Sequence, residues 1–334
     1  MKKNKFIIML GISVFLVGII SVCSSNDHCD NLVTKKTMNQ EKQVKVLKLN
    51  PLGKNADDTA IKNVNIDKEN KNLFGKSRKA YSVKKIRYTE KDLKKIAGCL
   101  NTKVEKMNED NGIKSCNLNN KGVLIYYDNS GSITYISEDS TLQEMPEKYK
   151  LNKNKCVKVA GKFLKKSNII DYKCLVLDNV EVGYTIETSK GERPLSYQIT
   201  FMKKQPKGVD GFAGIGPGIR VDVDCKYNIT SFTSVNKEIT ELDGEYSTLS
   251  LEEAEKKIES NGEVQLSTDT SNLKNNTIEN VDIDNVEVRL YSDSTNLKQE
   301  YMAPYYVFSG KDNNGAAVSV TIPAVSDEEF RIKE

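Results

Sequence analysis

Two aspartates, Asp222 and Asp224, have a spacing that could do chemistry on one strand. They alternate with valines, and side chains two positions apart on a strand point to the same face. Carboxylate oxygens suit hard cations such as calcium, and Asp282 or Asp284 could supply further ligands. The same alternation is routine in half-exposed sheets, so we favour a solvated strand face and predict no metal site.

Histidine chemistry is limited to one residue, His28. It lies near the N-terminus, in a segment expected to be a flexible stalk, so it cannot complete a folded site. This excludes Ser-His-Asp and Cys-His nucleophile activation and histidine-based zinc sites. We therefore expect no enzyme and no cofactor. A carboxylate-dependent cell-wall hydrolase stays open as an alternative, because the separation of two acids cannot be read from one sequence.

The N-terminus has the pattern of an export signal. Lysines at the tip precede an uncharged apolar run, Phe6 to Ile20, which is long enough for a signal peptide and slightly short for a membrane span. The run ends at Ile20-Ser-Val-Cys23, which resembles a bacterial lipobox, although Val22 stands where Gly or Ala is usual. We expect cleavage after residue 22 and lipidation of Cys23; an uncleaved anchor and full secretion are the alternatives. All three place the remaining chain outside the cytoplasm.

The exported part is almost neutral. The whole chain has 50 Lys and Arg against 46 Asp and Glu, and its basic tip accounts for most of the difference. No electrostatic footprint for nucleic acid is present, and no polybasic block adjoins the anchor. We expect attachment to the membrane through the N-terminal anchor and no nucleic-acid partner. Abundant Lys and Asn without Trp is typical of an AT-rich Gram-positive genome.

Composition and periodicity divide the exported chain into a stalk and three modules. Residues 23–79 are rich in Asn, Lys and Asp, which is typical of a segment that cannot bury enough apolar surface to order itself. Short apolar stretches at Val44–Leu49 and Leu73–Phe74 could pack locally. We expect a β-α-β-β module over residues 80–140, followed by two similar modules over residues 150–240 and 248–326.

Each module contains a helix with recognisable signals. Thr89-Glu-Lys-Asp92 and Ser250-Leu-Glu-Glu253 resemble capping boxes. A third helix is expected over residues 152–167, because its apolar residues recur on one face. The expected strands cover residues 80–88, 122–127, 132–137, 173–188, 195–203, 218–225, 228–239, 286–291, 305–309 and 316–325. This order predicts an α+β fold in which a helix packs on an antiparallel sheet, in repeated modules.

The last two modules look like copies of each other. Leu177-Asp-Asn-Val-Glu-Val182 recurs as Ile283-Asp-Asn-Val-Glu-Val288, and a helix precedes each copy. A strand near a proline and then a glycine-led strand follow in both. Ordered landmarks of this kind favour an internal duplication.

The chain from about residue 150 to 325 resembles the PepSY-like and YycI-like exported domains of Gram-positive bacteria. The resemblance rests on three stretches: Ser250-Leu-Glu-Glu-Ala254, Gly216-Pro-Gly-Ile-Arg-Val-Asp-Val-Asp224, and Pro304-Tyr-Tyr-Val-Phe-Ser-Gly310 before Ile322-Pro-Ala-Val325. It implies a noncatalytic protein: some relatives inhibit peptidases, and YycI-like and YycH-like proteins restrain a membrane sensor kinase. Those kinase regulators are anchored by a true transmembrane helix, whereas the apolar run of this chain ends at a cysteine, Cys23.

We accordingly expect a noncatalytic cell-surface lipoprotein that acts by protein contact, with an envelope sensor kinase or peptidase as its partner. The alternative is an accessory lipoprotein that binds an extracellular peptide or glycan. For either role the expected contact loop is the glycine-rich segment before residue 218, where glycines allow close backbone approach. Its candidate residues are Gly208, Gly211, Phe212, Gly214, Ile215, Gly216 and Gly218. A long hairpin connection is the other interpretation.

Six cysteines follow Cys23 in a compartment that permits disulfides: Cys29, Cys99, Cys116, Cys156, Cys174 and Cys225. None has metal-site spacing, so we interpret most of them as small buried apolar residues. The best disulfide candidates are Cys99 with Cys116 and Cys156 with Cys174.

An aromatic group near the C-terminus comprises Tyr301, Tyr305, Tyr306 and Phe308. It could stack on a sugar or peptide. The alternation is more typical of a strand buried on both faces, so we predict core packing.

Overall fold

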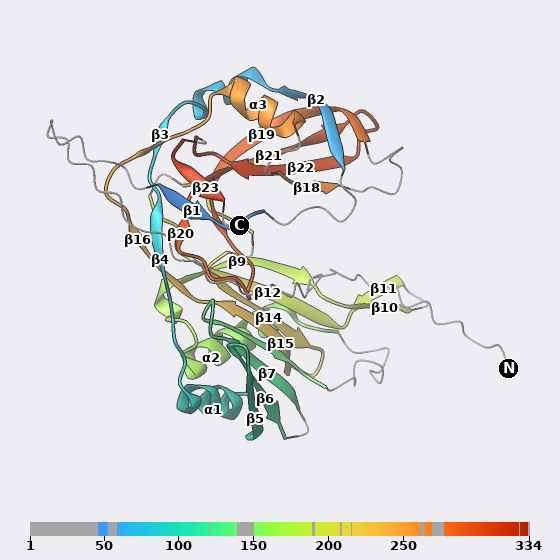
Figure 1. The fold of residues 1–334 in the computed structure, drawn as a ribbon. Helices are drawn as coiled ribbons and strands as arrows, with labels where there is room; N and C mark the ends of the chain where they lie inside the picture. Colours follow the sequence, from blue (N-terminus) through green and yellow to red (C-terminus); the bar gives the residue numbers. More distant parts are fainter. Residues whose placement is uncertain are drawn as a thin grey trace, which may run out of the picture.

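The computed structural model describes residues 46–52, 59–119, 121–138, 150–188, 191–207, 209–214, 216–260, 264–268, 277–326 and 328–332. Two large sheets lie one above the other in the view of Figure 1, and α-helices lie on their outer sides. We call the lower unit the N-terminal lobe and the upper unit the C-terminal lobe. Among the described helices, none combines the length and apolar character needed to cross a bilayer.

An eight-stranded antiparallel sheet forms the N-terminal lobe, in the order β5-β6-β7-β8-β15-β14-β12-β9. Its strands are β5 (Val104–Asp110), β6 (Ile113–Leu118), β7 (Gly122–Tyr127), β8 (Ser132–Ile136), β9 (Leu175–Val182), β12 (Ser196–Lys203), β14 (Gly218–Asp224) and β15 (Ile229–Val235). Residues 80–140 and 150–240 therefore share one sheet, because β8 pairs with β15.

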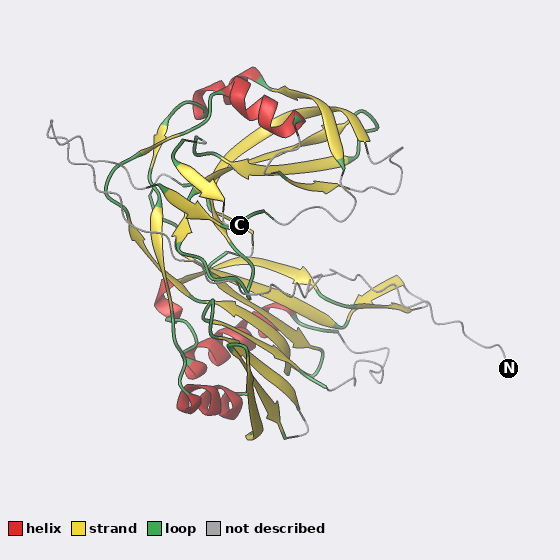
Figure 2. Cartoon of the chain, in the orientation of Figure 1, coloured by secondary structure: helices red, strands yellow, loops and turns green. Residues whose placement is uncertain are grey.

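Helices α1 (Glu90–Cys99) and α2 (Lys153–Ser167) lie against one face of this sheet, at its left in the view of Figure 2. The predicted capping box at the start of α1 is confirmed: the Thr89 hydroxyl accepts from the Asp92 N–H, and the Asp92 carboxylate accepts from the Thr89 N–H at 2.8 Å. At the start of α2, the Asn152 side chain accepts from the Lys155 N–H. Both helices bury their apolar stripes in one core with the sheet, which includes Leu93, Ile96, Leu124, Phe163, Leu164, Val221 and Phe232.

The C-terminal lobe is built on a six-stranded sheet ordered β13-β19-β21-β22-β18, with β2 also paired to β19. Its strands are β2 (Ala60–Ile66), β13 (Phe212–Gly214), β18 (Gln265–Thr268), β19 (Thr277–Ser292), β21 (Pro304–Asp312) and β22 (Ala317–Pro323). Helix α3 (Leu251–Glu259) begins at the predicted Ser250 capping box and contacts β2 and β22. Its Ala254 and Ile258 are buried against this sheet.

Short elements connect the lobes. Strand β4 (Tyr81–Lys85) pairs with β16 (Lys237–Glu241), which follows β15, and with β20 (Tyr301–Met302), which precedes β21. The remaining elements are β1 (Leu47–Leu49) with β23 (Phe330–Ile332), β3 (Ser77–Arg78) with β17 (Tyr246–Ser247), the hairpin β10 (Thr185–Thr188) and β11 (Gly191–Pro194), and the 3₁₀ helices η1 (Lys68–Leu73) and η3 (Tyr172–Cys174).

The predicted α+β class, built from repeated modules that each pack one helix on a sheet of its own, is wrong: helices do pack on the sheets, but strands dominate and two of the expected modules share one sheet. Strands make up 52% of the described residues and helices 17%, so the fold is β-rich with several large antiparallel sheets. The prediction missed β5 and β6: the sequence VEKMNED of β5 lacks apolar alternation, and in IKSCNL of β6 only Cys116 and Leu118 alternate. These strands form because neighbouring strands supply their hydrogen bonds.

The expected stalk also differs from the structure. Residues 47–49 and 60–66 form β1 and β2, and η1 follows β2. Their apolar residues are few but regularly placed, and Leu47, Ile61 and Ile66 are buried. The part of the stalk before residue 46, together with Cys23, His28 and Cys29, lies outside the described residues.

The two similar motifs occupy equivalent strands. In β9, Val180 lies opposite Ile199 of β12; in β19, Val286 lies opposite Phe308 of β21. Both ladders have a bulge at the aspartate of the motif, because the pairing skips Asp178 in one and Asp284 in the other. The similarity therefore extends from the sequence to strand position, register and bulge.

Candidate functional site

The glycine-rich loop joins the two lobes. It leaves the N-terminal lobe between β12 and β14, and its strand β13 pairs in parallel with Leu290–Ser292 of β19. Gly214 has φ +71°, and a Cβ there would lie 2.3 Å from the Ser292 carbonyl oxygen. The carboxylate of Asp210 accepts from the Val288 N–H at 2.9 Å. The loop thus contributes directly to the sheet of the other lobe.

The other expected loop residues have similar surroundings. A Cβ at Gly218 would lie 2.3 Å from the Phe201 carbonyl oxygen, while Gly216 packs against the Met202 side chain. Phe212 packs beside Tyr81, Leu290 and Met302, and Gly211 has open space where a Cβ would stand. Gly208 and Ile215 lie outside the described residues. Close packing between chain segments accounts for the glycines at 214 and 218.

A buried lysine lies close to the place where β13 meets β19, which we call the joint between the lobes. The Lys237 ammonium donates to Gln299 Oε1 at 2.7 Å and to Ser292 Oγ and the Asp293 carbonyl oxygen at 3.3 Å. Its side chain is only 1% exposed, and this burial lowers its pKa from 10.5 to about 8, while Asp293 acts in the opposite direction. Asp293 is itself buried and accepts from Asn50. Polar groups from distant segments therefore hold the lobes together.

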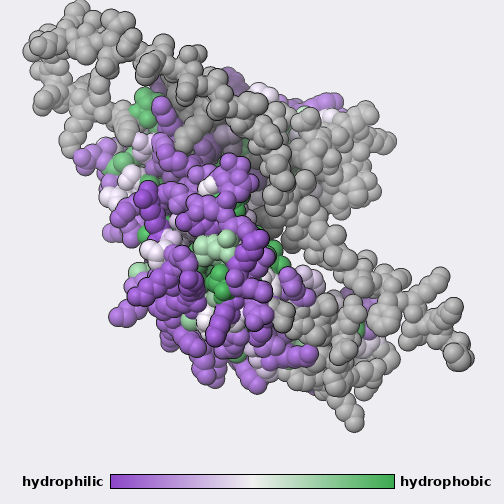
Figure 3. Space-filling model, turned by 60° about the horizontal axis from the view of Figure 1, so that its bottom comes forward, coloured by the Kyte–Doolittle hydropathy of each residue, from purple (hydrophilic) through white to green (hydrophobic). Residues whose placement is uncertain are grey.

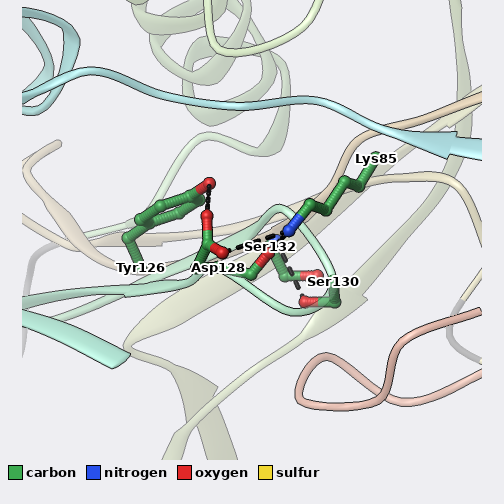
Figure 4. A network of polar contacts seen from close by, with 5 residues as sticks. All are labelled: Lys85, Tyr126, Asp128, Ser130 and Ser132. Carbon is green, nitrogen blue, oxygen red and sulfur yellow. Dashed lines mark hydrogen bonds and ion pairs between the residues drawn. The ribbon is translucent and has the colours of Figure 1, made fainter. Parts of the chain in front are cut away.

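Lys85 makes a second polar contact beside this joint (Figure 4). Its ammonium donates to the Asp128 carbonyl oxygen at 2.5 Å and carboxylate at 3.1 Å, and the Tyr126 hydroxyl donates to the same carboxylate. The Lys85 contact lowers the pKa of Asp128. Ser130 Oγ accepts from the Ser132 N–H and donates to the Thr295 carbonyl oxygen of the other lobe. The network anchors the β7–β8 turn to β4 and to the C-terminal lobe.

A small hollow lies between α1 and the end of α2. It has a volume of about 150 Å³ and is lined in part by Arg87, Tyr88, Lys95 and Asn168. The Tyr88 hydroxyl donates to the Ile169 carbonyl oxygen at 2.5 Å and accepts from Asn236, and burial raises its pKa to about 12. This tyrosine is thus held in structural hydrogen bonds and stays protonated at neutral pH.

The structure does not bring the four candidate calcium ligands together. Asp222 accepts from Gln198 and Ser231, and burial raises its pKa. Asp224 accepts from backbone N–H groups of the β14–β15 turn. Asp282 and Asp284 lie in the other sheet. Within the described ranges, no group of three or more His, Cys, Asp or Glu residues is arranged to hold a metal ion.

The five described cysteines are free thiols, so neither candidate disulfide, Cys99 with Cys116 or Cys156 with Cys174, is formed. Cys116, Cys156 and Cys225 are buried, which confirms the interpretation of most cysteines as small core residues. Burial raises the pKa of each of these three thiols. The aromatic prediction is also confirmed, because Tyr305, Tyr306 and Phe308 are buried in the C-terminal lobe.

Strand β9 and the two residues that follow it carry four exposed apolar side chains. They are between 44% and 51% exposed: Val176, Leu177, Val182 and Tyr184. β9 ends the eight-stranded sheet, and no strand in the described part of the chain pairs with its outer edge. The described residues on the underside of the view in Figure 1 are largely hydrophilic (Figure 3). The sequence showed β9 as one of two similar motifs but gave no sign that only this copy would be exposed.

No family model matches the chain, and no curated protein matches it. One solved structure, of an uncharacterized protein from Eubacterium rectale, is similar at 12% identity with a TM-score of 0.39, covering 77% of this chain and 86% of that one.

Proposed function

We propose that this chain is a membrane-attached protein of the cell surface that acts by binding another protein and catalyses no reaction. The N-terminal export pattern and the family resemblance motivate the location and the kind of partner, an envelope sensor kinase or peptidase. The observation that carries the contact role is the exposed edge of β9.

A sheet edge is suited to protein contact for two reasons. Its outer N–H and C=O groups are available to another chain, and such edges are commonly blocked by charge, proline or a covering segment. β9 instead exposes Val176, Leu177 and Val182 within eight residues. Exposed apolar side chains gathered at one place are typical of an interaction surface.

The proposal is tested by crosslinking the natively anchored protein in cells and identifying the products by mass spectrometry. We expect one dominant envelope protein, whose yield falls at least several-fold in Leu177→Asp. The matched control is Ile136→Asp, because Ile136 is 52% exposed and Leu177 50%. The absence of a specific partner for the wild-type protein would contradict the proposed function.

A further inference from the structure

The two copies of the repeated motif differ in what covers them. Leu177 of β9 corresponds to Ile283 of β19, and Val182 corresponds to Val288. The two β9 residues are 50% and 49% exposed, whereas their counterparts are each 2% exposed. Equivalent apolar positions in equivalent strands are therefore buried in one lobe and open in the other.

In the C-terminal lobe, two other segments of the chain cover the edge of the motif strand. β2 pairs in parallel with Thr277–Ile283, which ends at the first residue of the motif, and β13 pairs in parallel with Leu290–Ser292, just beyond the motif. Between them, the Asp67 N–H donates to the Ile283 carbonyl oxygen at 3.0 Å, and the Asp210 N–H donates to Val288 at the same distance. Ile61, Val64 and Ile66 of β2 join the core that buries the motif. In the covered copy, the two segments therefore pair with β19 on either side of the motif, and their backbone N–H groups contact its first and last residues.

The chemistry of β2 complements the acidic strand that it covers. Lys62 forms an ion pair with Glu279 at 2.8 Å, and the Asn65 amide donates to Asp282 at 3.0 Å. β9 is acidic as well: its sequence LVLDNVEV contains Asp178 and Glu181 and no basic residue. A strand with apolar residues on one face and Lys or Asn on the other therefore matches β9 in both polarity and charge.

We propose that the outer edge of β9 binds an extended segment of a partner protein, which adds to the sheet as a parallel strand with the character of β2. The inference rests on the proposed protein-contact function and specifies how that contact is made. A second copy of this chain fits less well. Two identical β9 edges related by a two-fold axis would pair antiparallel, and the acidic residues of both strands would lie next to each other. Both segments that pair with β19 in this chain run parallel to it instead.

The backbone of β9 is oriented for this pairing. Gly183 donates its N–H to the Ser196 carbonyl oxygen of β12 at 3.0 Å. Because successive N–H groups of a strand point to opposite edges, the Val182 N–H is directed outward. Its counterpart in the covered copy, the Val288 N–H, donates to the Asp210 carboxylate.

The test uses the full chain in detergent and a fluorescent peptide with the sequence of residues 59–68, TAIKNVNIDK. Fluorescence anisotropy measures binding, and hydrogen exchange locates it. We expect saturable binding that slows exchange in β9. Affinity should fall at least ten-fold in Leu177→Asp and in Val182→Pro, which removes the outward N–H together with the exposed valine side chain, and should be unchanged in Ile136→Asp. Thermal melting establishes that each variant is folded.

Three results would overturn the proposal. They are no saturable binding to the wild-type protein, binding that is equal in Leu177→Asp and the control, and sedimentation showing a dimer that Leu177→Asp abolishes. The last would assign the edge to a second copy. Failure here with a crosslinked envelope partner still present would refute strand addition at β9 and leave the broader protein-contact function standing.

Discussion

At the scale of single residues, Lys237 is the group whose charge depends most on its surroundings. Burial lowers its pKa from 10.5 to about 8, so between these pH values the unfolded chain binds a proton that the folded chain lacks. The contribution of Lys237 to the free energy of unfolding should therefore rise with pH across this window, by at most about 3 kcal/mol. The wild-type free energy of unfolding minus that of Lys237→Met should show this rise, because the buried thiols contribute equally to both proteins. Urea denaturation of both proteins between pH 8 and 10.5 measures the difference.

The matched control is Lys84→Met, because Lys84 lies on the neighbouring strand with its side chain 80% exposed. It should follow the wild-type profile, and parallel profiles for all three proteins would refute the assigned role of burial.

Sequence alone could not identify Lys237. In KEITE it resembles any strand lysine, and its contact with Ser292 spans 55 residues of sequence. Burial of this kind is decided by tertiary packing.

At the scale of elements, β13 needs glycine where it approaches β19. Gly214→Ala adds a Cβ at positive φ and within 2.3 Å of a backbone oxygen, so we expect a loss of at least about 1–3 kcal/mol in the free energy of unfolding. Gly98→Ala is the matched control, because Gly98 lies in α1 with open space around it. It should stabilise the protein by about 0.5–1 kcal/mol. Equal effects of the two substitutions in urea denaturation would contradict this account.

The elements that could be predicted from the sequence are those with local determinants. The capped starts of α1 and α3 and the β7–β8 turn require only residues adjacent in sequence. The strands β5 and β6 could not be predicted, because their polar sequences become strands through pairing within the sheet. The exposed edge of β9 was equally hidden, since its motif is nearly identical to the covered one in β19.

At the scale of the whole molecule, the two lobes share structure at several places. β4 pairs both with β16, which follows the N-terminal sheet, and with β20, which precedes β21 of the C-terminal sheet. β13 leaves the N-terminal lobe and pairs with β19, and the buried Lys237 donates to Ser292. These links combine backbone pairing with buried polar contacts, and an isolated lobe would lose both. The lobes should therefore unfold as one cooperative unit.

Calorimetry tests this cooperativity. We expect a single heat-absorption peak for the wild-type protein, with equal calorimetric and van't Hoff enthalpies. Gly214→Asp should separate the unfolding into two transitions, because a side chain there displaces β13 from β19 while leaving the core of each lobe intact. Ile136→Asp, on an exposed position away from the joint, should keep the single peak. Two transitions in the wild-type protein would mean that the contacts between the lobes contribute too little free energy to make them unfold together. In that event the β9 edge would belong to an independently folding N-terminal lobe, and partner binding there would stabilise that lobe alone.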